Sequence, residues 1–169
     1  KKEYHVVVVK STVAPETTAK VVLPLIEKYS NKKAGVGFGV CMNPEFLREG
    51  DAVVDFMNPD RIVIGEFDKK SGNVLAQVYK KFDTDIVRTS LANAEMIKYA
   101  NNSLLATLIS FSNEIANIAE AIPGANAFDI FKGVYLDKRL NPFVSNKRVN
   151  PNILSYLSPG CGFGGSCFP

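Results

Sequence analysis

In the first half of the chain, apolar residues form short runs separated by longer stretches with helical spacing. The runs are rich in Val and Ile, which is the pattern of buried strands, and cover residues 5–10, 36–42, 61–65 and 85–88. Between them, apolar residues recur every three to four positions over 15–29 and 72–82. Strands that alternate with helices predict an α/β fold with a mostly parallel sheet.

The pattern changes near Ser90. Residues 92–121 contain no Pro and no Gly, and their apolar side chains cover most of the circumference of a helix. A helix of about 30 residues is about 45 Å long, more than one small domain buries. Burial of this apolar surface by a second subunit is the simplest explanation, so we predict a homodimer through the 92–121 helix. The alternative is that other parts of the same polypeptide bury it. Asn126 then caps a predicted short helix that ends near 134, and the rest is predicted as loop.

These patterns divide the chain into two predicted parts. Residues 1–89 form the C-terminal part of a Rossmann-like parallel sheet, and residues 90–169 form an all-α part with one long dimerisation helix. The chain has no initiator Met, begins inside a predicted strand and ends within a glycine-rich motif. We therefore expect a piece of a longer polypeptide, with a trimmed complete domain as the alternative.

Composition narrows the class of protein. Hydrophobic residues make up 46% and charged residues 22%, which is typical of soluble globular proteins. The net charge of +3 is too small to predict nucleic-acid binding, and no apolar run reaches the length of a membrane span. Three widely spaced cysteines without a visible secretion signal predict a reducing, cytoplasmic location. One His and no CxxC pair predict no metal site.

Two glycine-rich runs have a spacing that is found in cofactor-binding loops. Gly160, Gly162 and Gly165 fit GxGxxG, and a second run lies at 35–39. A dinucleotide fingerprint needs a strand before it and a helix after it. The first run follows a predicted loop and the second continues as a strand, so neither is predicted to bind the cofactor. The glycines beside Cys167 fit a backbone that lets a ligand approach a nucleophile.

Several polar residues lie on the apolar helix or close to the ends of predicted strands, where they are candidates for a function. Lys98 and Asn102 are four residues apart and share one face of the long apolar helix. A lysine there needs a partner or a polar pocket, unless both side chains reach solvent. Thr12 ends the first strand, where α/β sheets bind ligands or where a helix is capped. On spacing alone, Glu45 and Glu49 are surface charges.

The residue types nevertheless form a chemically coherent set around Cys167. Cys167 lies in a glycine-rich loop, whereas Cys41 lies in a predicted core strand. A thiol captures an aldehyde as a thiohemiacetal, and Lys98 with Asn102 can stabilise the resulting oxyanion. A carboxylate can then act as the base for hydrolysis of a thioester.

Five segments together resemble the UDP-glucose/GDP-mannose dehydrogenase family. In chain order they are VKSTV at 9–13, NPEFLREG at 43–50, RIVIG at 61–65, KYANN at 98–102 and GFGGSCFP at 162–169. The resemblance implies an N-terminal NAD domain, a central domain with a long dimerisation helix and a C-terminal nucleotide-binding domain. It also implies oxidation of a sugar C6 alcohol to a carboxylate with two reductions of NAD⁺. This chain resembles the end of the first domain and most of the second.

The same resemblance implies a role for each matching residue. Cys167 is the nucleophile, Lys98 and Asn102 hold the oxyanion and the catalytic water, and Glu45 is the acid/base. Thr12 positions water at the cofactor side, and Glu49 lies near the nicotinamide. The implied substrate contacts are the backbone of Phe46 and Leu47, with Tyr156, Phe163, Gly164 and Arg139. Arg139 matches an arginine that reaches the neighbouring subunit's substrate, and Arg148 competes for this role because the preceding loop is long.

The chain also departs from the family pattern. The Lys-Asp pair expected after Pro169 is absent, and so is the dinucleotide fingerprint, so we expect the parent protein to be an enzyme and this piece alone to be inactive. The GFGGSCFP phrase resembles UDP-glucose 6-dehydrogenases, and Ser166 argues against N-acetylated sugars. We therefore predict oxidation of UDP-glucose to UDP-glucuronate. The alternatives are GDP-mannose oxidation, a non-catalytic dimerisation module and an NAD-binding regulatory domain.

Overall fold

The computed structural model describes residues 4–164, and the chain divides into two compact units, Lys1–Tyr99 and Ala100–Pro169. The boundary between the units falls within α4 (Leu91–Glu120), the helix predicted from the absence of Pro and Gly. Among residues 4–164, no helix is both long enough and apolar enough to cross a membrane.

A four-stranded sheet forms the centre of the first unit. Its strands lie in the order β1 (Val6–Val9), β2 (Gly39–Met42), β3 (Ile62–Glu66) and β4 (Ile86–Thr89). β1 pairs with β2 and β3 pairs with β4 in parallel, which confirms the α/β prediction. β2 and β3 are antiparallel, which the sequence did not predict. The carboxyl ends of β1 and β2 therefore share one edge, and those of β3 and β4 share the opposite edge.

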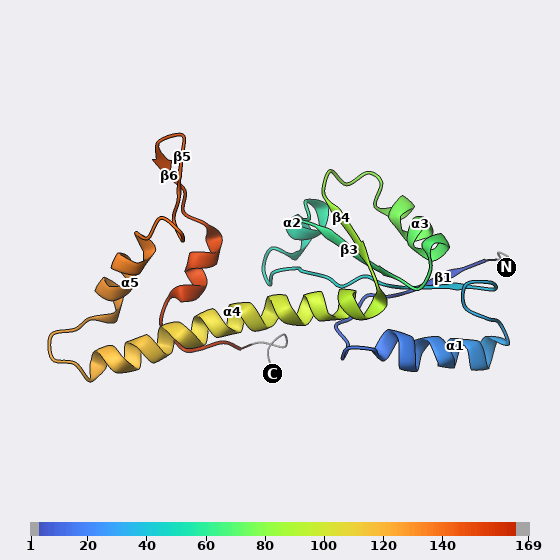
Figure 1. Ribbon diagram of the computed structural model, residues 1–169, viewed down its shortest axis with the longest axis horizontal. Coiled ribbons are helices and arrows are strands. Elements are labelled where there is room, and N and C mark those ends of the chain that lie inside the picture. Colours follow the sequence, from blue (N-terminus) through green and yellow to red (C-terminus); the bar gives the residue numbers. More distant parts are fainter. Residues whose placement is uncertain (1–3, 165–169) are drawn as a thin grey trace. The chain divides into compact units, whose positions relative to one another are not determined.

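Alternating side chains give the sheet two apolar faces. Cys41, Ile62 and Ile64 pack with Leu75 of α3 (Lys69–Val78) on one face. Met42 and Val63 pack with Leu91 and Ala94, from the first turns of α4, on the other face. In Figure 1, α3 and α1 (Leu23–Ser30) lie on opposite sides of the sheet. Period-two alternation thus assigns each strand residue to one of two helical layers.

The helices of this unit differ in detail from the prediction. The helix expected from residue 15 is preceded by Glu16 in a left-handed conformation (φ 71°), and its first turn, Thr18–Val22, is π-helical. α2 (Ala52–Met57) is a short helix in a segment for which no element was predicted. α3 begins three residues earlier than predicted, because Asp68 and Ser71 form a capping box at its N-terminus.

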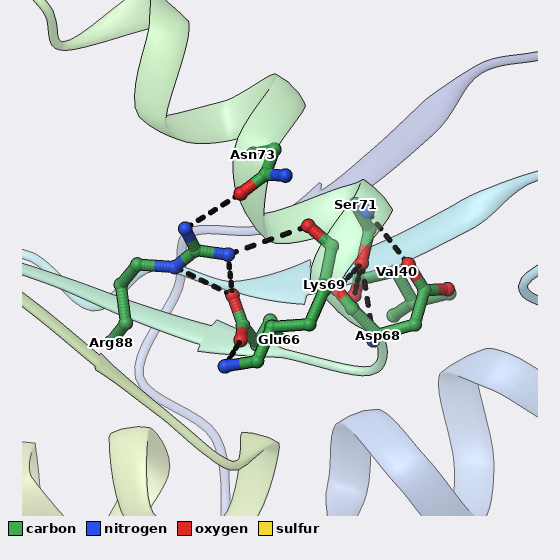
Figure 2. A network of polar contacts seen from close by, with 7 residues as sticks. All are labelled: Val40, Glu66, Asp68, Lys69, Ser71, Asn73 and Arg88. Atoms are coloured by element: carbon green, nitrogen blue, oxygen red, sulfur yellow. Dashed lines mark hydrogen bonds and ion pairs between the residues drawn. The ribbon is translucent and has the colours of Figure 1, made fainter.

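A polar network holds α3 to the sheet (Figure 2). Glu66 at the end of β3 accepts hydrogen bonds from Arg88 Nε on β4 and from Lys69 Nζ, each at 2.8 Å. Arg88 Nη1 also donates to Asn73 Oδ1 of α3 at 2.7 Å. The Glu66 side chain is only 8% exposed. These bonds satisfy a buried carboxylate and join two strands to one helix.

The second unit contains the rest of α4 and a small apolar cluster. Asn126 caps α5 (Ala127–Tyr135) through hydrogen bonds from Phe128 N and Asp129 N, as predicted. Phe131 of α5 packs with Leu154 and Leu157 from the 3₁₀ helix η2 (Asn152–Leu157).

The all-α prediction for this part was wrong in one place. β5 (Phe143–Val144) and β6 (Lys147–Arg148) form an antiparallel hairpin within the predicted loop. Ser145 and Asn146 both have positive φ, which is the backbone of a two-residue type I′ turn.

Candidate functional site

The carboxyl ends of β1 and β2 lie side by side. Val9 is the register partner of Met42, and Asn43 N donates to Val9 O at 2.9 Å. The segments that carry the predicted residues Thr12 and Glu45 therefore leave the sheet from adjacent strands. Thr12 is exposed at this edge. It does not cap the following helix, because Thr17 occupies the N-cap position.

Lys98 and Glu45, which are 53 residues apart in sequence, form an ion pair at this edge. Lys98 Nζ donates to Glu45 Oε1 at 3.2 Å, while Glu45 Oε2 accepts from Leu47 N at 2.7 Å. The Lys98 side chain is 5% exposed and the Glu45 side chain is 33% exposed. The buried ammonium thus has the partner that the apolar helix required, and the carboxylate remains accessible.

The ring of Phe46 contributes to the same site. Lys98 Nζ lies 5.4 Å from the ring centroid, and the guanidinium carbon of Arg61 lies over the ring at 4.1 Å. Cation–π contacts of this kind help to offset the desolvation of a buried cation. Leu47, the next residue, is exposed.

The loop beyond Leu47 is held by a second ion pair. Arg48 donates to the Asp55 carboxylate of α2 through Nε at 3.0 Å, Nη2 at 2.5 Å and its backbone N at 2.8 Å. These hydrogen bonds lower the pKa of Asp55 to about 2. Glu49 is exposed in this loop. The Arg48–Asp55 pair therefore anchors the loop that carries Glu49 to α2.

Lys10 and Asn43 belong to the site and were not predicted from the sequence. Lys10 Nζ donates to Asn43 Oδ1 at 2.8 Å, and Asn43 Nδ2 donates to Val63 O at 2.7 Å. The hydroxyl of Tyr79, the residue directly after α3, also donates to Asn43 Oδ1. Burial lowers the pKa of Lys10, and the charge of Glu45 partly opposes this. The available signal was the position of both residues, each directly after a strand.

The second unit carries the other predicted site residues. Asn102 is partly buried on α4, Tyr156 is partly buried in η2, and Phe163 and Gly164 are exposed. Asn113 of α4 accepts a hydrogen bond from Gly160 N at 2.8 Å, which fixes the start of the glycine-rich segment. Cys167, the predicted nucleophile, lies outside the described residues.

The two candidate arginines differ in their surroundings. Arg139 is 88% exposed and pairs with Asp137 at 2.5 Å, which lowers the pKa of Asp137 to about 2. Arg148 Nη1 donates to Leu136 O at 2.9 Å and Asn141 O at 3.3 Å, and its guanidinium lies over the Phe143 ring. Arg148 thus bonds two backbone carbonyls and lies over a ring, whereas Arg139 pairs with a neighbouring carboxylate and stays highly exposed.

The two described cysteines also differ. Cys41 is fully buried in β2, as predicted, and burial is the main cause of the raised pKa of its thiol. Cys161 is exposed. A protonated, buried Cys41 is a packing residue, because the thiolate is the reactive form.

Comparison with known proteins relates both units to one family. Residues 1–83 match the NAD-binding domain, and residues 92–169 the central domain, of the UDP-glucose/GDP-mannose dehydrogenase family. The GDP-mannose 6-dehydrogenase of Azotobacter vinelandii is 48% identical over 171 residues, covering 100% of this chain and 36% of that protein.

Two solved structures are also similar. The UDP-glucose dehydrogenase of the archaeon Pyrobaculum islandicum has a TM-score of 0.80 and 42% identity, covering 98% of this chain and 34% of that one. A ternary complex of GDP-mannose dehydrogenase from Pseudomonas aeruginosa has a TM-score of 0.75 and 48% identity, covering 83% of this chain and 32% of that one. The chain therefore spans about a third of the length of the relatives that it matches.

Proposed function

Because the chain belongs to the UDP-glucose/GDP-mannose dehydrogenase family, we propose that the protein containing it oxidises the C6 alcohol of a nucleotide sugar to a carboxylate. The observation that carries the proposal is the Glu45–Lys98 pair, with its buried ammonium and accessible carboxylate at the open edge of β1 and β2. Open α/β sheets bind ligands outside the carboxyl ends of their strands.

Cys167 supplies the covalent chemistry in this proposal. NAD⁺, when bound, accepts one hydride in each of the two oxidations. After the alcohol has become an aldehyde, the Cys167 thiolate forms a C–S bond to the aldehyde carbon, and the carbonyl oxygen takes the negative charge. Lys98 and Asn102 stabilise that oxygen, which is protonated in the thiohemiacetal. Loss of the second hydride and of the hydroxyl proton leaves a thioester on sulfur.

Glu45 acts in the hydrolysis of the thioester. Water attacks the carbonyl carbon, the C–S bond breaks with its electron pair remaining on sulfur, and the carboxylate product leaves. Glu45 takes the proton from the attacking water, while Thr12 holds that water in position. The hydrogen bond from Leu47 N and the ion pair with Lys98 fix the orientation of the Glu45 carboxylate. A fixed, partly exposed carboxylate suits this role.

Two residues of the first unit are candidates for the nicotinamide end of NAD. Thr12 and Glu49 are both exposed, Thr12 directly beyond β1 and Glu49 in the loop between β2 and α2. The glycines at 35–39 lead into β2, as the sequence pattern predicted, and we do not assign them to the cofactor. We assign Thr12 and Glu49 to contacts with the nicotinamide side of the cofactor.

The substrate contacts in this proposal are those predicted from the family resemblance. The backbone of Phe46 and Leu47 lies next to Glu45, and Tyr156, Phe163 and Gly164 complete the predicted set. Of the two arginines, Arg139 is the better candidate for a neighbouring subunit's substrate, because its side chain is 88% exposed, whereas Arg148 bonds two backbone carbonyls and lies over the Phe143 ring. An Arg139→Ala variant should raise KM for the nucleotide sugar, whereas Arg148→Ala should mainly alter the hairpin.

UDP-glucose is the substrate predicted from the cysteine motif, and its product is UDP-glucuronate. GDP-mannose is the second candidate, because GDP-mannose dehydrogenases of Azotobacter vinelandii and Pseudomonas aeruginosa are 48% identical to the chain. The UDP-glucose dehydrogenase of Pyrobaculum islandicum is 42% identical. The ratio of kcat/KM for the two nucleotide sugars decides between them.

We also propose that the enzyme is a cytoplasmic homodimer that associates through α4. Leu104, Phe111 and Ile118 are each about half exposed within the second unit and are spaced by seven residues. Side chains with this spacing form a stripe along one side of a helix, which another helix can cover. Light scattering of the full-length protein is expected to give a dimer, and a monomer would refute this part of the proposal.

The proposed reaction is tested with the full-length protein. Incubation with NAD⁺ and either nucleotide sugar should release two NADH per sugar oxidised. Cys167→Ser should abolish uronate formation, whereas Cys161→Ser should retain it. Absence of turnover with both sugars contradicts the proposal. In that case, an unreactive Cys167 in a thiol-labelling experiment on the Cys161→Ser variant would favour the non-catalytic dimerisation module.

A further inference from the structure

Glu95 is a buried acidic residue that the mechanism above does not use. Its side chain belongs to α4, three residues before Lys98, and the residue is 1% exposed. The carboxylate accepts two backbone hydrogen bonds, from Glu16 N at 2.5 Å and from Thr18 N at 2.8 Å. Glu16 lies in the connection after β1, and Thr18 is the first residue of the helix that follows it.

Thr18 N needs an acceptor because it lies in the first turn of a helix, whereas Glu16 N lies just before the N-cap residue. The first backbone N–H groups of a helix have no partner within the helix. The side chain of the N-cap residue, Thr17, makes no capping hydrogen bond to any residue within 4–164. The Glu95 carboxylate therefore caps this helix from a different helix. Charge-assisted bonds and the positive end of the helix dipole offset the desolvation of a buried carboxylate.

This cap fixes the segment that carries Thr12. Before Thr12, Lys10 is hydrogen-bonded to Asn43. After Thr12, Val13 packs in the apolar cluster of Met42, Leu91 and Ala94, and Glu95 holds the amides at 16 and 18. Thr12 thus lies in a short loop with anchors on both sides. Its position relative to α4 depends on Glu95.

We propose that Glu95 is a positioning residue for the dehydrogenase reaction, and this inference rests on the proposed function. Glu95 holds the 12–18 segment against α4, so that Thr12 keeps a fixed position relative to Lys98 on the same helix. It does not contact the reacting atoms. A small displacement of a residue that orients water is enough to slow a reaction, since misplacement by about 1 Å can reduce rates roughly a hundredfold.

The test uses Glu95→Gln in the full-length enzyme, with Glu95→Asp as the conservative variant. Gln keeps the shape of the side chain but directs an amide donor at one backbone N–H, so one of the two bonds is lost. We expect kcat per folded active site to fall roughly tenfold to a hundredfold, with KM for the nucleotide sugar unchanged. Glu95→Asp retains the carboxylate and should recover part of kcat. Glu120→Gln, at the exposed end of α4, is the matched control and should behave as wild type.

Amide hydrogen exchange provides a second measurement that does not depend on catalysis. The amides of Glu16 and Thr18 should lose protection in Glu95→Gln, while the β2 amides should retain theirs. Loss of protection together with the fall in kcat supports the inference. A lower thermal midpoint with unchanged kcat per folded site overturns it and leaves Glu95 a purely structural residue. A wild-type protein that turns over neither nucleotide sugar overturns the proposed function as well, which separates the two failures.

Discussion

Two glutamates in the first unit each pair with a cation, but their surroundings differ. Glu66 accepts hydrogen bonds from Arg88 and Lys69, and its side chain is 8% exposed between two strands and α3 (Figure 2). Glu45 has one cationic partner, Lys98, and one loop amide, and its side chain is 33% exposed. In the first pair the carboxylate is enclosed, whereas in the second the cation is buried and the carboxylate is accessible.

The difference separates a structural pair from a candidate catalytic pair. An enclosed carboxylate whose acceptor positions are occupied by its neighbours has little capacity to exchange a proton with a ligand. An accessible carboxylate beside a desolvated ammonium has that capacity and a partner for developing negative charge. Perturbing each pair in turn should therefore change different properties of the protein: catalysis for Glu45–Lys98 and stability for Glu66–Arg88.

The largest expected effect comes from Lys98→Met in the full-length enzyme. Methionine fills a similar volume in the buried site but offers no donor to an oxyanion. Removal of one such donor typically reduces kcat by roughly a hundredfold to a thousandfold. Steady-state NADH formation measures the loss. If Lys98→Met retains wild-type kcat, the pair is structural and the contrast with Glu66 disappears.

The second expected effect is on stability, from Arg88→Met. Glu66 would keep Lys69 as a partner but lose the guanidinium that joins β4 to β3 and α3. Leaving a buried charge poorly satisfied lowers the free energy of unfolding by about 1–3 kcal/mol. Calorimetry should therefore detect a lower thermal midpoint, while kcat per folded site stays at the wild-type value. Lys69→Met, which removes the more exposed partner, should have a smaller effect.

The sequence predicted local features well where one physical rule determined them. The Val- and Ile-rich runs became strands, the segment without Pro and Gly became α4, and Asn126 capped α5. The antiparallel pairing of β2 and β3 was not predicted, because strand direction depends on the path of the long 43–61 connection. α2 was missed because six residues are too few for a helical period to be recognised in the sequence. The β5–β6 hairpin was missed although Ser145-Asn146 offered a turn signal.

In the candidate site, too, local features were predicted from the sequence and long-range contacts were not. Lys98 was predicted to need a partner because it lies on an apolar helix, and Glu45 was chosen by family resemblance. The spacing in sequence did not predict that Lys98 and Glu45 form a pair, because 53 residues separate them. Glu95 gave no signal, because a single acidic residue on a helix is usually solvated. Its role depends on a contact with residues 77 and 79 positions away, which only the folded chain reveals.

The smallest expected effect is the pH dependence of the Glu66 contribution to stability. Burial favours a higher pKa, but the hydrogen bonds from Lys69 and Arg88 prevail and hold the pKa of Glu66 below its ordinary value of 4.5. A depressed pKa in the folded state means that the contribution is complete above about pH 4.5 and is lost as pH falls through the lowered pKa. The difference in thermal midpoint between wild type and Glu66→Gln should therefore be constant from pH 5 to 7 and shrink below pH 4.5. Glu45→Gln, the matched variant of the other pair, should reduce kcat, and it should also lower the midpoint because the buried Lys98 ammonium then has a neutral partner. A difference between wild type and Glu66→Gln that grows on acidification would mean that Glu66 is stabilised as the neutral acid, and the enclosed pair would then be more like a titrating site than a structural one.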